Sequence, residues 1–340
     1  MNEAIRILCA DHLHQCMWLS ATPEHERLRI TYATTSNFAD STLPVILYCG
    51  PMFGSRYGCL DINRLANEIG VRIICVDRPG MGGSTLCPLN IRIKVWLETV
   101  PALLKKLNVK HVSLVSHSAG TMYLLNTMYY LRDILDPNAP YVALAGPFAN
   151  KEHTHATLPS LGSRLPISWL HSWSSVNRFI LSRVMPATSW SGGLITSTAE
   201  LFQSEPGTSN SGEMTFAEKL GVSEEVGNAA EKLQIKYFLA ENTEAATQEL
   251  LLCLNKGEAG SWGICEDYSA YVNQLVQSER ERWESTQKAS PAKLRLKFFF
   301  AESDVMIGEG GRRYVEECWK QTGVGDVMDV TTTVLKVTES

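Results

Sequence analysis

The sequence predicts an α/β protein with a doubly wound, mostly parallel β-sheet and a large helical insertion. Up to residue 149, and again after residue 287, short apolar runs alternate with helix-like segments. This alternation at short spacing is typical of a parallel sheet covered by helices on both faces. Residues 150–287 show no β-alternation, and they hold five of the eight tryptophans. We therefore expect a core of residues 1–149 and 288–340, and a helical cap of residues 150–287.

The first part of the core is expected to contribute five strands and three helices. Apolar runs rich in β-branched residues predict the strands at residues 28–37, 43–50, 71–80, 112–115 and 141–148. Helix-like patterns lie at residues 61–70, 92–108 and 121–135. Asp61 and Gly70 are suitable residues to begin and end the first helix. Pro101 is expected to kink the second helix, and the third is apolar nearly all round, as in a buried helix.

The second part of the core is expected to complete the sheet. The run at residues 294–304 predicts a strand, residues 308–323 a helix, and residues 328–337 a final strand. Within the insertion, the polar stretch at residues 203–214 is typical of an exposed loop.

Composition and charge argue against nucleic-acid and membrane partners. The 340 residues carry a net charge of -5 and no long basic run. The first 18 residues are interrupted by charged residues and histidine, so they lack the apolar core of a signal peptide. No segment approaches the roughly 18 consecutive apolar residues of a membrane span. We expect a cytoplasmic protein that binds neither nucleic acid nor a membrane.

The nine cysteines indicate reduced thiols rather than a disulfide framework or a zinc site. Their number is odd, and no two of them form a C-x-x-C pair. Cys75 falls within a predicted buried strand. We therefore expect no metal and no organic cofactor.

The stretch Ser116-His117-Ser118-Ala119-Gly120 raises the question of a nucleophile. A predicted buried strand precedes it and a predicted helix follows it. A strand, a sharp turn carrying serine and a helix form the arrangement called a nucleophile elbow. The alternative is a serine in an ordinary turn between a strand and a helix.

Four stretches together make the chain resemble a serine-type α/β-hydrolase with a large helical cap: SHSAG, CGPMFGSRY, DRPGMGGS and FFFAESD. The resemblance covers residues 28–149 and 288–340. In the elbow pattern G-x-S-x-G, Ser116 replaces the first glycine and Gly120 is retained. The chain is similar to α/β-hydrolases of fungal genomes, some of which act in secondary metabolism. Serine at the elbow argues against the branches with an aspartate nucleophile, haloalkane dehalogenases and epoxide hydrolases.

The resemblance implies roles for several residues. Ala119, which follows Ser118, would supply one backbone N–H of the oxyanion hole. The other donor would come from the CGPMF loop; because proline has no N–H, Met52 is the candidate, with Phe53 as the alternative. Asp304 would be the acid that orients the base. The glycine spacing of the DRPGMGGS stretch matches neither the P-loop nor the G-x-G-x-x-G motif of nucleotide-binding proteins. We therefore interpret this stretch as a structural turn.

The catalytic base is the missing member of this set. The family's histidine follows the acid, whereas no histidine follows His171 in this sequence. Three hypotheses stay open, in this order: an altered C-terminal end of the chain, a relocated base at His153 or His155, or a non-catalytic protein that binds a small acyl compound. The first two imply a serine hydrolase that cleaves an ester, thioester or related acyl bond.

Overall fold

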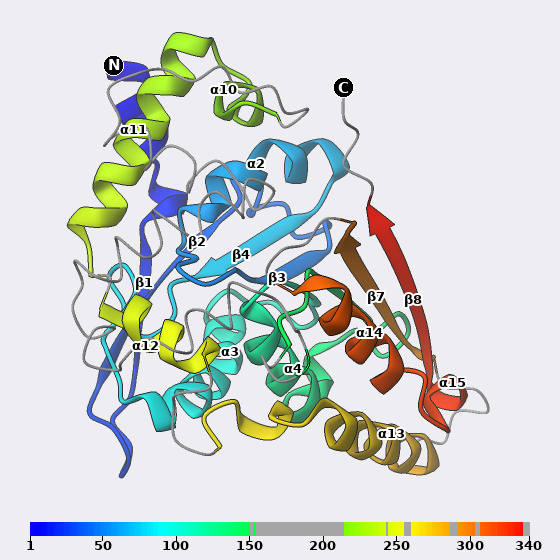
Figure 1. Ribbon diagram of the computed structural model, residues 1–340. Coiled ribbons are helices and arrows are strands. Elements are labelled where there is room, and N and C mark those ends of the chain that lie inside the picture. Colours follow the sequence, from blue (N-terminus) through cyan, green and yellow to red (C-terminus); the bar gives the residue numbers. More distant parts are fainter. Residues whose placement is uncertain are drawn as a thin grey trace.

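The computed structural model describes residues 1–149, 153, 214–242, 244–254, 260–285, 292–302 and 307–335. Its described strands form one eight-stranded sheet in the order β1-β2-β4-β3-β5-β6-β7-β8 (Figure 1). The strands are β1 (Gln15–Leu19), β2 (Leu28–Thr34), β3 (Val45–Cys49), β4 (Arg72–Val76), β5 (Ser113–His117), β6 (Tyr141–Ala145), β7 (Leu294–Ala301) and β8 (Met328–Leu335).

The sheet is mostly parallel, as the sequence predicts. Strands β4, β3, β5, β6, β7 and β8 pair in parallel, and β2 pairs antiparallel with both β1 and β4. Parallel neighbours end at the same edge of a sheet. In the pairing of β3 with β5, Cys49 lies opposite Ser116. The loop after β3 therefore begins beside the turn that carries Ser118.

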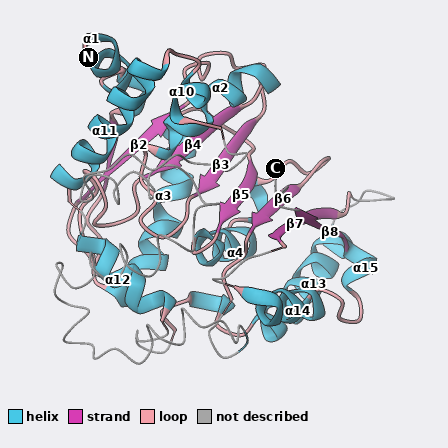
Figure 2. Cartoon of the chain, turned by 45° about the horizontal axis from the view of Figure 1, so that its top comes forward, coloured by secondary structure: helices cyan, strands magenta, loops and turns pink. Residues whose placement is uncertain are grey.

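Helices accompany the strands along the chain. They are α1 (Asn2–Leu8), α2 (Gly58–Ile69), α3 (Arg92–Lys106), α4 (Gly120–Tyr130), α10 (Phe216–Leu220), α11 (Glu224–Ala240), α12 (Glu244–Cys253), α13 (Tyr268–Ser285), α14 (Gly308–Cys318) and α15 (Val324–Val327). Four short 3₁₀ helices are η1 (Asp11–Leu13), η2 (Leu89–Ile91), η3 (Arg132–Ile134) and η6 (Gly263–Cys265). Figure 2 shows α10 beside α2, and α13 and α14 near β7 and β8.

Helices cover the two faces of the sheet with two separate hydrophobic clusters. Alternation along β4 shows the division, because successive side chains of a strand point to opposite faces. Ile74 and Val76 belong to a cluster with α3, α4 and α13. Ile73 and Cys75 belong to a second cluster with α1, α2 and α11. This is the doubly wound arrangement that the sequence predicts.

Most predicted elements are present, and most are shorter than predicted; α2 instead begins at Gly58, three residues before Asp61. Gly70 ends α2 in the left-handed conformation, at φ 71°, as expected of a helix C-terminus. Pro101 lies inside α3. The sequence interpretation missed α1 and β1. All nine cysteines are free and seven of them are buried.

The described residues between 214 and 285 form helices and connecting segments. The division into a core and a cap of residues 150–287 stays a prediction. No helix in the described part of the chain combines the length and the apolar character that crossing a bilayer requires.

Candidate active site

Ser118 stands in the sharp turn between β5 and α4. Its φ is 49°, in the left-handed region that residues other than glycine seldom adopt. The Ser118 N–H donates to the carbonyl of Ala145 at 3.0 Å, and the Ser118 carbonyl accepts from the N–H of Thr121 at 3.0 Å. A non-glycine residue in this region has a strained backbone. Backbone strain of this kind persists only where the surrounding structure imposes it, and it is frequent at functional sites. The Ser118 residue is half-buried, so it is accessible from the carboxyl edge of the sheet.

Gly120 is required by close packing behind the turn. A Cβ at this position would lie 2.0 Å from the carbonyl oxygen of Cys49 and 2.6 Å from that of Gly50. Any side chain would push α4 away from the loop after β3. Ser116, in contrast, is accommodated: it is fully buried, and its hydroxyl has no hydrogen-bond partner among the described residues. The elbow therefore tolerates serine at its first small position but only glycine at its last.

The loop after β3 forms a tight turn beside the elbow. The Gly54 N–H donates to the Pro51 carbonyl at 2.8 Å. Phe53 inside this turn has a φ of 63°. The N–H groups of Met52, Phe53 and Ala119 make no hydrogen bond with any described residue. Because backbone N–H groups in folded proteins almost always have a partner, these are the donors suited to an oxyanion.

Arg78, which follows β4, binds two backbone carbonyls of this loop. Its Nη1 donates to the Gly50 carbonyl at 2.7 Å, and its Nη2 donates to the Pro51 carbonyl at 2.5 Å. The same guanidinium donates to both carboxylate oxygens of Glu249 in α12, at 2.5 and 2.8 Å. Burial opposes the charge on Arg78, but the Glu249 carboxylate outweighs it and raises the pKa of the guanidinium. Arg78 therefore stays charged.

The DRPGMGGS stretch is a structural turn around a buried carboxylate. Asp77 accepts from the Arg56 N–H at 2.6 Å, from Arg56 Nη1 at 2.7 Å and from the Thr31 hydroxyl at 2.6 Å. Burial raises the pKa of Asp77, although Arg56 opposes the shift. A Cβ on Gly82 would lie 2.3 Å from this carboxylate. Gly82 thus makes room for Asp77, which supports the interpretation as a turn rather than a phosphate site.

Solved structures resemble the chain over nearly its whole length. An esterase from Rhodococcus sp. ECU1013 matches with a TM-score of 0.53 at 11% identity, covering 95% of this chain and 91% of that chain. An epoxide hydrolase from Vigna radiata matches with a TM-score of 0.52 at 12% identity, covering 96% of this chain and 93% of that chain. The chain has the α/β-hydrolase fold. No protein-family model and no curated protein matches the sequence. At these identities, the likeness shows the α/β-hydrolase fold alone.

The structure describes only one of the three residues that the sequence suggests as acid or base. Asp304 and His155 lie outside the described residues. His153 is described, and its ring stacks on Tyr314 of α14 with centroids 3.6 Å apart and planes 9° apart. No hydrogen bond joins His153 to Ser118. The structure places Ala119 directly after Ser118 and the start of the Met52 loop beside the turn, and it places His153 against an aromatic ring.

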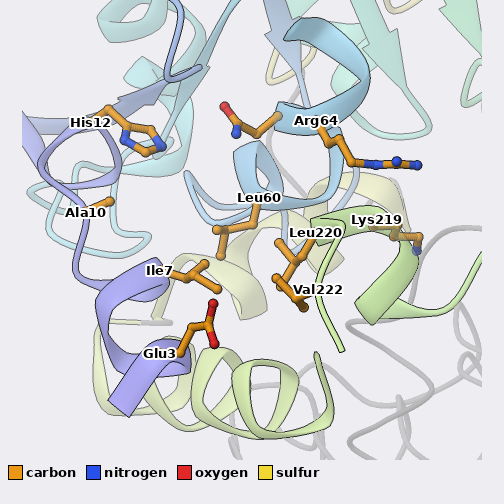
Figure 3. Close-up of a pocket in the computed structure, with 10 residues that line it drawn as sticks. Glu3, Ile7, Ala10, His12, Leu60, Arg64, Lys219, Leu220 and Val222 are labelled. Carbon is orange, nitrogen blue, oxygen red and sulfur yellow. The ribbon is translucent and has the colours of Figure 1, made fainter. Parts of the chain in front are cut away.

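A cavity of about 270 Å³ lies away from the α/β-hydrolase elbow. Figure 3 shows it between α1, α2 and the α10 region, with Glu3, His12, Arg64 and Lys219 around it. Burial lowers the pKa of His12. No predicted site residue lines this cavity, so it is not the substrate cavity that the elbow implies.

Arg78 and Glu249 are the site residues that the sequence interpretation missed. They are separated by 171 positions. One signal was present: Glu249 is a charged residue directly before Leu250, Leu251 and Leu252, and a charge within such a run suggests a buried partner.

Proposed function

We propose that the protein is a serine hydrolase that cleaves an ester, thioester or related acyl bond of a small organic substrate. The observation that carries the proposal is the left-handed backbone of Ser118 between β5 and α4, with φ at 49°. This geometry is the nucleophile elbow of the α/β-hydrolase fold. The free N–H groups of Ala119 and Met52 support it, because acyl transfer builds negative charge on a carbonyl oxygen.

The reaction would proceed in two steps. The Ser118 Oγ forms a bond to the acyl carbon, and the leaving group departs with the proton that a base has taken from Ser118. Water then attacks the acyl-enzyme, releases the acid and restores the hydroxyl. Asp304 is proposed as the acid that orients the base. A place in secondary metabolism and a cytoplasmic location stay predictions.

The second candidate function is a non-catalytic protein of this fold that binds a small acyl compound. The absence of any histidine after His171 favours it. Loss of the triad histidine or serine costs roughly a millionfold in turnover, or about 8 kcal/mol. Such a protein would keep its binding site and lose its turnover.

A fluorophosphonate probe separates the two functions. We expect the full chain to be labelled on Ser118, with Ser118 Oγ displacing fluoride, and we expect Ser118→Ala to abolish labelling. Ser116→Ala is the matched control, because Ser116 lies two residues away and is fully buried. An unlabelled wild-type chain that still binds acyl compounds would favour the binding protein.

His153 and His155 are tested as relocated bases by the single variants His153→Ala and His155→Ala. Loss of a working base is expected to slow labelling by a factor of about 10² or more. Unchanged labelling in both variants would remove the hypothesis of a relocated base.

A further inference from the structure

Helix α12 meets the proposed oxyanion loop, residues 50–54, through two kinds of contact. The apolar side chains of Leu250, Leu251 and Leu254 form a buried cluster, and Met52 packs against it. On the polar side, Glu249 binds the guanidinium that donates to the carbonyls of Gly50 and Pro51. The loop is therefore seated on α12 as well as on the sheet.

Arg78 controls the peptide unit that carries the proposed donor. The Pro51 carbonyl and the Met52 N–H belong to the same planar trans peptide unit, in which they point in opposite directions. Arg78 Nη2 binds that carbonyl at 2.5 Å, together with the Gly54 N–H at 2.8 Å, so it helps to fix the direction of the N–H. A charged donor on the carbonyl also polarises the peptide, since linked hydrogen bonds strengthen one another. Arg78 thus both aims and strengthens the Met52 donor.

Glu249 in turn fixes Arg78. The two side chains are 3% and 1% exposed, and two charge-assisted hydrogen bonds join them. The Tyr123 hydroxyl donates to Glu249 at 3.3 Å, and the Arg78 guanidinium lies 4.9 Å from the centre of the Tyr123 ring. The Tyr123 ring thus covers one face of the guanidinium, while Glu249 and the loop carbonyls accept its N–H groups. Without the carboxylate, it would be a buried cation free to turn away from the loop.

We propose that Glu249 is a positioning residue that acts through Arg78 on the Met52 N–H. By this contact, the seating of α12 sets how well the oxyanion loop stabilises negative charge. The role rests on the proposed serine-hydrolase function. It predicts that a change in α12 that leaves Ser118 untouched lowers the reactivity of Ser118.

The chain offers a matched control for this test. Arg132 and Glu279 form a second buried pair, at 2.6 and 3.1 Å, with side chains 8% and 1% exposed. It joins η3 to α13, and neither residue bonds the loop of residues 50–54. Glu279→Gln therefore removes a buried carboxylate from its arginine without changing the contact with the loop, and Glu249 differs further only in lying 3.8 Å from Arg92 Nη1.

The first measurement is the kinetics of Ser118 phosphonylation by a fluorophosphonate in the full-length chain. In Glu249→Gln we expect the maximal rate constant to fall about 10- to 100-fold, because misplacing a donor by about 1 Å costs up to a hundredfold. The half-saturating probe concentration is expected to stay within about twofold of the wild-type value, and Glu279→Gln to stay within about twofold in both parameters. An unchanged maximal rate in Glu249→Gln would overturn the proposal.

The second measurement is hydrogen exchange of a peptide covering residues 50–57, which contains the bonded N–H groups of Gly54 and Arg56. We expect faster exchange in Glu249→Gln than in Glu279→Gln. This comparison keeps the two proposals separate: a wild-type chain without labelling defeats the serine-hydrolase function, while exchange alone then decides the positioning role. Equal exchange in both variants would overturn the role. If Glu249→Gln does not fold, Glu249→Asp, which keeps the charge and shortens the side chain, replaces it with the same expected direction.

Discussion

Two buried glutamates of residues 214–285, Glu249 and Glu279, each bind a buried arginine, yet the two arginines, Arg78 and Arg132, differ in what else they hold. Arg78 binds Glu249 and also the carbonyls of two loop residues. The side chain of Arg132 binds Glu279 alone among the described residues. Burial and pair geometry are closely similar. The comparison indicates that a buried ion pair influences a neighbouring site through the further groups that its arginine binds, here the carbonyls of Gly50 and Pro51, and not through the strength of the pair itself.

The largest expected effect tests whether the two pairs are alike in stability. Glu279→Ala leaves one buried guanidinium without its carboxylate, which costs about 3–5 kcal/mol, and Glu249→Ala leaves two, because Arg92 Nη1 also lies 3.8 Å from Glu249. We expect the free energy of unfolding, measured by urea denaturation, to fall at least as much in Glu249→Ala as in Glu279→Ala. A much smaller loss for Glu249→Ala would mean that the loop carbonyls alone satisfy Arg78, and the comparison would break.

The next effect concerns the contact between the elbow and the loop that Arg78 holds. In Gly120→Ala the new Cβ would lie 2.0 Å from the Cys49 carbonyl oxygen, so α4 and the loop must separate. We expect a loss of about 3 kcal/mol in unfolding free energy, together with a large loss of Ser118 labelling.

Gly58→Ala is the control for this prediction. Gly58 is the first residue of α2, and a Cβ there would meet no atom within 4 Å. It should change stability by less than about 1 kcal/mol and leave labelling unchanged. A Gly120→Ala chain as stable and as reactive as Gly58→Ala would contradict the packing of the elbow.

A smaller effect is expected at Asp61, a carboxylate with no ion pair among the described side chains, unlike Glu249 and Glu279. Burial raises the pKa of Asp61 to about 6 from a usual value of 3.8, although Lys219 opposes the shift. The folded chain thus binds this proton more tightly than the unfolded chain does, and stability is lost as pH rises from about 4 to 6.

Asp61→Asn should remove that loss and stabilise the protein by about 2 kcal/mol at pH 7. Urea denaturation of both chains at pH 4 and pH 7 measures it. A wild-type stability that rises over this range relative to that of Asp61→Asn would contradict the shift.

Sequence reasoning succeeds where the structure follows from local pattern. The strand before Ser118, the turn and the helix after it lie within 30 consecutive residues, and their small and apolar residues show them directly. Short β1 was missed because its exposed positions, Cys16 and Trp18, are as apolar as its buried ones, Met17 and Leu19, so the alternation in burial does not show in the sequence. The contact of Arg78 with Glu249 joins residues 171 positions apart; the leucines after Glu249 suggest that it is buried, but no local pattern indicates which residue is its partner. The identity of the catalytic base is undecided for the same reason. A histidine acts as a base because of its position in the fold, which its neighbours in sequence do not reveal.

The central claim is that Ser118 reacts at a hole formed by two backbone N–H groups. A crystal structure of the phosphonylated full-length protein tests it most directly. We expect the phosphonyl group on the Ser118 Oγ, with its free oxygen about 3 Å from the nitrogens of both Ala119 and Met52. An adduct on another serine, or an oxygen turned away from both nitrogens, would contradict the account.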